Sequence, residues 1–202
     1  MARRVALFLM SAGVSREWVA IIGMILGILA GLSFFVTSEM PEPQWFWLLG
    51  MIFCLLRIGT IQIVSFLSPN SSRTLSEDEF FNELPERVSD AVTMIGFGFA
   101  AYSSPWLGLG AALGAIFSAY VRSMGQTMGA GIKDYARGPM TRTHRLTLVS
   151  ITSILMICGI SYERFQTPIP QIALWTIIIG CFATIALRLI SLSRLRRKKI
   201  VK

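Results

Sequence analysis

The chain has 202 residues, of which 53% are hydrophobic and only 15% are charged, and its mean hydropathy is +0.61. A soluble globular domain usually carries about 25% charged residues, so the composition argues against one and predicts a single all-α integral membrane domain over residues 1–202. The net charge of +8 arises mostly between and after the apolar runs, which fits membrane topology and lipid headgroups better than nucleic acid.

The N-terminal segment carries Arg3 and Arg4 before a short apolar stretch, and so it imitates a secretory signal peptide. The apolar stretch has only about six residues, which is short for a cleaved signal sequence. We therefore expect residues 1–17 to form an amphipathic segment that lies on the membrane surface.

Six apolar runs follow, most of them near the length that a helix needs to cross a bilayer. They cover residues 18–36, 45–67, 88–101, 106–124, 146–161 and 172–190. The sequence therefore predicts six transmembrane helices in a bundle over residues 18–190, followed by a basic tail over residues 191–202. Tryptophans near the predicted span ends are typical of interfacial anchors, and they are Trp45, Trp47, Trp106 and Trp175.

The basic residues fall on one side of this predicted bundle. That side receives Arg3, Arg4, Arg16, Arg73, Lys133, Arg137, Arg142, Arg145 and the basic tail, whereas the other receives Arg164. The positive-inside rule then predicts a multi-pass protein of the inner (plasma) membrane with both termini in the cytoplasm. It also places the acidic segment 76–91 and the basic loop 133–145 on the same side.

The cysteines and the small residues have ordinary structural interpretations. Cys54, Cys158 and Cys181 each lie in an apolar run without metal-ligand spacing, which predicts buried, inert thiols. The stretch "GLGAALGA" in the fourth run places small residues four positions apart, at Gly110 and Gly114 for example. Such spacing predicts close helix packing, either within the bundle or in a homodimer.

The segment "SEDEFFNELPERVSDA", residues 76–91, holds six of the chain's eleven acidic residues. Ser76 and Glu79 have capping-box spacing, so a helix is expected to begin there and to continue into the third span. Asn82, Glu86 and Asp90 recur every four residues and share one stripe of that helix. A stripe of oxygen ligands at the membrane surface favours a divalent cation; the alternative is a solvated acidic helix start.

Glu83 and Arg87, beside this stripe, are spaced for an i,i+4 ion pair. Three further arginines surround the fourth and fifth spans, with Arg122 ending the fourth and Arg142 and Arg145 preceding the fifth. Guanidinium groups recognise phosphate in a planar, bidentate manner. These three arginines are therefore candidates for binding phosphate, and the alternative is charge that sets topology and contacts anionic lipid.

Several segments together resemble the CDP-alcohol phosphatidyltransferase family. "GVSREWVAIIGMILGILAG", "FFNELPERVSDA", "SAYVRSMG" and "TRTHRL" are similar to family segments in the same order, and the resemblance covers nearly the whole chain. It implies a six-helix bundle of that type, active in phospholipid biosynthesis. The implied reaction transfers a phosphatidyl-type group from a CDP-linked lipid to a small alcohol or alcohol phosphate and releases CMP.

The resemblance also implies roles for individual residues. Asn82 and Glu86 would hold Mg²⁺ or Mn²⁺, and Glu86 would act as the catalytic base. Arg122, Arg142 and Arg145 would bind the substrate phosphate.

One half of the family signature, D-x2-D-G-x2-A-R-x8-G-x3-D-x3-D, is absent. Its first two aspartates would fall at Ile61 and Val64, and no acidic residue lies between Glu42 and Glu77. A second hypothesis is therefore a non-catalytic relative that needs no cofactor and binds a lipid, a nucleotide or a catalytic paralogue. A third is a transporter with Arg57 and Arg188 along its path.

Overall fold

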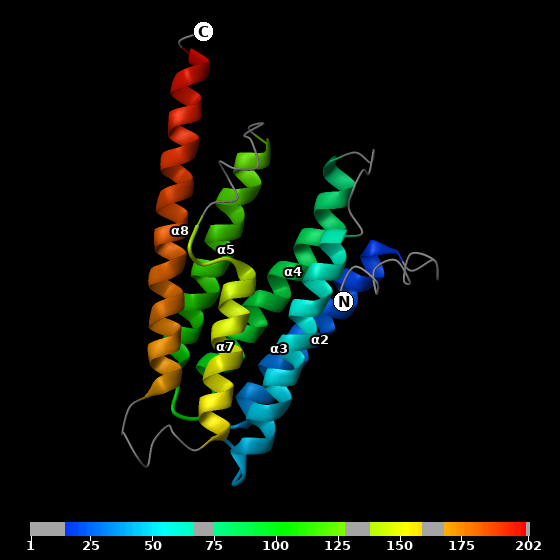
Figure 1. Cartoon of the computed structure of the whole chain (residues 1–202), viewed down its shortest axis with the longest axis vertical. Coiled ribbons are helices and arrows are strands. Elements are labelled where there is room, and N and C mark those ends of the chain that lie inside the picture. The colour runs from blue at the N-terminus through cyan, green and yellow to red at the C-terminus, as the bar shows by residue number, and fades with distance from the viewer. Residues whose placement is uncertain (1–14, 67–74, 128–137, 159–167, 201–202) are drawn as a thin grey trace.

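The computed structural model describes residues 15–66, 75–127, 138–158 and 168–200, and within these it leaves out the side chains of residues 66, 75–82 and 195–200. The described chain forms six helices and contains no strand, which confirms the all-α prediction (Figure 1). The helices are α2 (Arg16–Val36), α3 (Pro43–Phe66), α4 (Leu75–Gly98), α5 (Pro105–Thr127), α7 (Arg142–Ile157) and α8 (Ile169–Ile200).

Four of these helices, α2, α3, α5 and α8, are long and apolar enough to cross a membrane. The helices α4 and α7 overlap the predicted third and fifth spans, but α4 begins beside the acidic segment, at Leu75, and α7 has only 16 residues. The structure therefore supports a helical membrane protein, while a total of six spans stays a prediction.

The helix α4 joins the acidic segment to the predicted third span without a break. It begins at Leu75, next to the predicted capping serine, and it runs to Gly98. Pro85 lies inside it and, because proline has no N–H, removes one hydrogen bond from the helix at that point. The expected continuous helix is thus present.

The structure describes most of the predicted C-terminal tail but little of the predicted N-terminal segment. Residues 1–14, most of the expected amphipathic segment, lie outside the described part. The helix α8 runs to Ile200, ten residues beyond the predicted end of the bundle, so the basic tail is helical up to that residue. Figure 1 shows this end of α8 projecting past the other helices.

The helix α2 packs against α3 and α4 through a glycine stripe. Gly23, Gly27 and Gly31 are four residues apart, and a Cβ atom added to Gly31 would lie 2.5 Å from the carbonyl oxygen of Val92. A Cβ atom added to Gly96 of α4 would lie 2.1 Å from the carbonyl oxygen of Gly31. Absence of side chains here lets the two backbones touch, as small residues do between helices in lipid.

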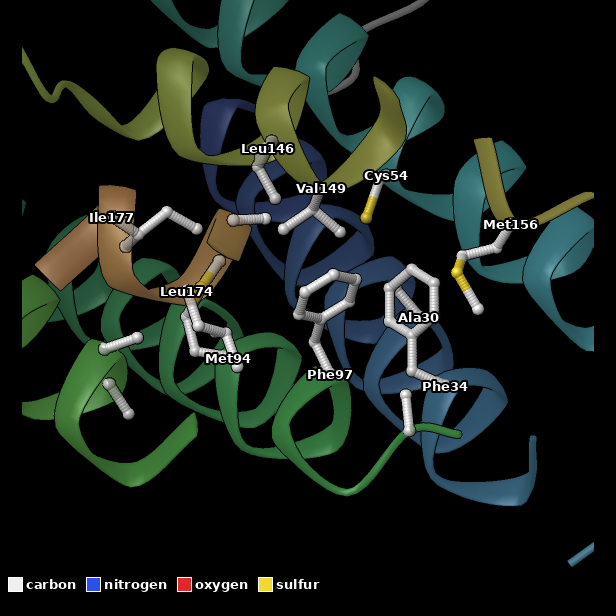
Figure 2. Packing of buried hydrophobic residues seen from close by; sticks show 14 of the residues in the cluster. Ala30, Phe34, Cys54, Met94, Phe97, Leu146, Val149, Met156, Leu174 and Ile177 are labelled. Atoms are coloured by element: carbon white, nitrogen blue, oxygen red, sulfur yellow. The ribbon is translucent and has the colours of Figure 1, made fainter. Parts of the chain in front are cut away.

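Three aromatic rings pack together at the other end of the same helices. Phe34 of α2 and Phe97 of α4 are both fully buried and have ring centroids 5.2 Å apart (Figure 2). Trp47 of α3 completes the cluster, at 5.5 Å from Phe34 and 5.8 Å from Phe97. The prediction that Trp47 is an interfacial anchor is therefore wrong: it is 1% exposed, because α3 turns it towards α2 and α4 while Trp45 faces outwards.

The small residues of α5 contact other helices of the same chain. A Cβ atom added to Gly108 would lie 2.6 Å from the Cα atom of Gly98 in α4, and one added to Gly114 would lie 3.1 Å from the Cβ atom of Cys181 in α8. The stretch "GLGAALGA" thus serves packing within the bundle, and a homodimer stays a prediction. Cys54 and Cys181 are buried as expected, whereas Cys158 is exposed because it follows the last residue of α7.

Candidate functional site

An ion-paired cluster joins α3, α4 and α7, and Asp90 of α4 lies at its centre. The Nη2 atom of Arg57 in α3 lies 3.2 Å from Oδ1 of Asp90. From α7, Nε of Arg142 and Nη2 of Arg145 lie 3.0 and 2.8 Å from Oδ2 of the same carboxylate. Both oxygens of Asp90 are therefore engaged by guanidinium groups.

Arg57 extends the cluster to α2. Its Nη1 group donates a hydrogen bond to the carbonyl oxygen of Gly23, and its Nη2 group also donates to the carbonyl oxygen of Glu86 at 3.2 Å. The Arg57 side chain is 2% exposed, so these bonds lie away from water. One side chain thus contacts two helices besides its own.

The outer edge of the cluster is formed by Glu86 and Arg142. The Nη1 group of Arg142 forms an ion pair with Oε2 of Glu86, and both side chains are partly exposed. Because both partners can be reached from the surface, their ion pair can exchange with a ligand more readily than the buried pairs around Asp90.

The charges in the cluster do not balance. Three arginines face two carboxylates, so the cluster carries one net positive charge. Burial alone would lower the pKa of Arg142, but the nearby carboxylates of Asp90 and Glu86 outweigh it and raise that pKa above its usual value. Arg142, which lies outside the four candidate spans, therefore stays cationic at any ordinary pH.

The residues of this cluster do not fit a divalent cation. A hard cation needs several free oxygen ligands, but Asp90 is already held by three guanidinium groups and Glu86 by one. The neighbouring helix α3 supplies Arg57 at this level, and a second cation beside it would be repelled. Within the described ranges, no group of three or more His, Cys, Asp or Glu residues is placed to hold a metal.

The predicted site residues separate into three groups. Glu86, Arg142 and Arg145 meet in the cluster, so the polar stripe of α4 does contact the arginines before the fifth span. Arg122 does not join those ion pairs in the described structure; it is exposed on α5, because the turn of the helix directs it outwards. Asn82 belongs to α4, but its side chain lies outside the described part.

Two central residues of the cluster were not assigned to the site by sequence reasoning. From the sequence, Asp90 is expected only on the polar stripe, with a divalent cation as its partner, and Arg57 only along a transport path. The signal is present in the sequence, since Arg57 is the one charged residue of the run 45–67 and Asp90 that of the run 88–101, and such charges in lipid usually need a partner. Arg188, the other residue of that hypothesis, is also buried and donates to Ser118 of α5.

The arrangement can bind an anion, because guanidinium groups are concentrated beside a partly exposed edge. The ion pair predicted for Glu83 and Arg87 is confirmed, and it lies on α4 outside the cluster as an ordinary helix-surface pair.

Comparison with known proteins assigns no family to the chain, since neither a family model nor a curated protein matches it.

Proposed function

We propose that the protein is a non-catalytic membrane protein, organised like the CDP-alcohol phosphatidyltransferases, that binds the phosphate group of a lipid or nucleotide. Arg142 binds the phosphate, and Arg145, buried behind it and held by Asp90, adds positive charge, at the end of the bundle that faces the cytoplasm of an inner-membrane protein. The observation that carries the proposal is that both carboxylates of the cluster are already paired with arginines. Such carboxylates are poorly suited to metal binding or to proton abstraction.

The ligand competes with Glu86 for Arg142. A phosphate group can offer two oxygens to one guanidinium in a bidentate pair, whereas Glu86 pairs with Arg142 through a single oxygen. Because Glu86 and Arg142 are both partly exposed, the phosphate can displace Glu86 into water at a small cost. Asp90 meanwhile keeps Arg57 and Arg145 in place.

Binding of CMP and of inorganic phosphate to the purified protein in nanodiscs tests the proposal, with vesicles of phosphatidic acid against phosphatidylcholine as the lipid arm. We expect Arg142→Gln to weaken binding about 10-fold to 100-fold, the equivalent of one charged hydrogen bond. We expect Glu86→Gln to strengthen binding, because it removes the competitor while it keeps the shape. Arg87→Gln, which alters only the surface pair with Glu83, is the matched control.

The three variants together show whether phosphate binds at Arg142 in competition with Glu86. Equal affinity of all three for every probe would overturn the proposal. Tighter binding of phosphatidic acid vesicles than of CMP would identify a lipid ligand, and the reverse would identify a nucleotide.

A divergent transferase is the second candidate, and one observation favours it. Glu86, which the resemblance proposes as the base, forms an ion pair with Arg142, and Arg145 lies beside it on Asp90. Release of CMP from a CDP-linked lipid, measured with Mg²⁺ or Mn²⁺ and a panel of alcohols and alcohol phosphates, tests it. Turnover that Glu86→Ala abolishes would establish the transferase and remove the non-catalytic proposal.

A further inference from the structure

Arg57 is surrounded by oxygen atoms from two neighbouring helices. Its guanidinium group donates to the backbone carbonyl of Gly23 in α2 and to the carbonyl of Glu86 and the carboxylate of Asp90 in α4. Carbonyl and carboxylate oxygens gathered around one positive centre are the ligands that proteins offer to hard cations. We infer that the Arg57 guanidinium is a tethered cation, which fills this oxygen-lined position from within the chain and makes the joining of α2, α3 and α4 independent of divalent metal.

Two glycines of α2 lie next to this side chain. A Cβ atom added to Gly27 would lie 3.3 Å from Cδ of Arg57, and one added to Gly23 would lie 3.5 Å from its Nη1 atom. The Gly27 position is also closed by Ser89, whose Oγ atom would lie 1.6 Å from the added Cβ. The lack of a side chain at Gly27 therefore leaves room for Ser89 and for the Arg57 side chain, whereas a Cβ atom at Gly23 would press on Thr60 and be in ordinary contact with Arg57.

Electrostatics excludes a second cation from the same position. Arg57, Arg142 and Arg145 all lie within 3.2 Å of the Asp90 carboxylate. A divalent ion bound to Asp90 would face all three guanidinium groups at short range in a medium of low dielectric constant. The inference does not depend on the proposed phosphate binding, and the measurements below contain no phosphate ligand.

The wild-type protein gives the first test. We expect its midpoint of thermal unfolding in detergent to be the same with EDTA as with millimolar Mg²⁺ or Mn²⁺. We also expect the electron paramagnetic resonance spectrum of added Mn²⁺ to be the same with the wild-type protein as with Asp90→Asn, because neither binds the ion at this position. Saturable stabilisation by either metal, lost in Asp90→Asn, would overturn the inference.

Variants of Arg57 give the second test, which separates charge from shape. Arg57→Met fills similar space without charge, so we expect its unfolding midpoint to fall by about 10 °C, the scale of a broken buried ion pair. Arg57→Lys restores a positive charge and should unfold at a higher temperature than Arg57→Met. Equal midpoints for the two variants, or the reverse order, would contradict a tethered cation.

Chemical rescue gives the third test. We expect millimolar guanidinium chloride to raise the unfolding midpoint of Arg57→Ala, while sodium chloride at the same ionic strength does not. Arg87→Ala is the matched control, because Arg87 pairs with Glu83 on the same helix and should show no rescue. A folded Arg57→Ala variant that guanidinium leaves unchanged would count against the inference, and if this variant does not fold, the comparison of Arg57→Lys with Arg57→Met decides.

Discussion

The same three helices, α2, α3 and α4, are joined at two levels by contacts of opposite kinds. At one level Arg57 of α3 binds the carbonyl of Gly23 in α2 and the carboxylate of Asp90 in α4. At the other level, Phe34, Trp47 and Phe97 pack as aromatic rings. Gly23 and Phe34 are eleven residues apart on α2, about 16 Å along its axis.

The difference between the two levels concerns specificity. Lipid tails are as apolar as side chains, so an aromatic contact in the bilayer gains packing energy but little hydrophobic driving force. An arginine in the same place must find its particular oxygen atoms, because an unsatisfied charge is costly there. The aromatic level therefore contributes close packing, whereas the charged level determines which faces of the helices meet.

The largest expected effect is at the charged level, from Asp90→Asn. This variant removes the anion that faces Arg57, Arg142 and Arg145, and we expect it to lower the free energy of unfolding by about 3–5 kcal/mol. The measurement is equilibrium unfolding in mixed micelles, with Glu83→Gln as the control for a partly exposed carboxylate. If Asp90→Asn were as stable as Glu83→Gln, the charged level would not hold the helices together.

A smaller effect is expected at the aromatic level, from Phe97→Ala. The loss should be about 2–3 kcal/mol, below the range for truncation of a buried phenylalanine in water, because lipid or its neighbours can partly replace the ring. The same unfolding assay measures it, and Phe182→Ala on α8, where the side chain is 64% exposed, is the control. If Phe97→Ala lost more free energy of unfolding than Asp90→Asn, the aromatic level would contribute more to stability than the charged level.

The smallest effect is expected between the two levels, from Gly31→Ala. The added Cβ atom would meet the Val92 carbonyl at 2.5 Å, so α2 and α4 must move apart, at a cost of about 1–2 kcal/mol. Gly59 of α3 has open space around its Cβ position, so Gly59→Ala should be neutral or slightly stabilising. Equal stability of the two variants would show that the close approach at Gly31 matters little.

The helical fold and part of the site could be predicted from sequence because both depend on local patterns. Apolar runs and the four-residue spacing of Glu86 and Asp90 each describe a single helix, whereas the capping box of Ser76 and Glu79 stays a prediction. The positive-inside rule places the acidic segment 76–91 and the basic loop 133–145 on one side of the membrane, so contact of the stripe with Arg142 and Arg145 is expected. The structure shows those ion pairs.

The remaining features depend on how the helices rotate against one another, which spacing alone does not give. Arg57 and Asp90 are 33 positions apart, and nothing local pairs them. Arg122 is expected at the end of a span, but α5 continues to Thr127 and Arg122 is exposed on it. Trp47 lies near a helix end but faces inwards. The glycine spacing of α2, in contrast, was visible in the sequence and could have identified the face that meets α4.

The helix α8 has 32 residues and is therefore about 48 Å long. The hydrocarbon core of a bilayer is about 30 Å thick, so an upright α8 would extend roughly 18 Å beyond it. Held upright, the helix would place a protein or a fluorescent tag at its far end above the lipid tails. A tag placed there would report tilting of α8 directly as a change in its height above them.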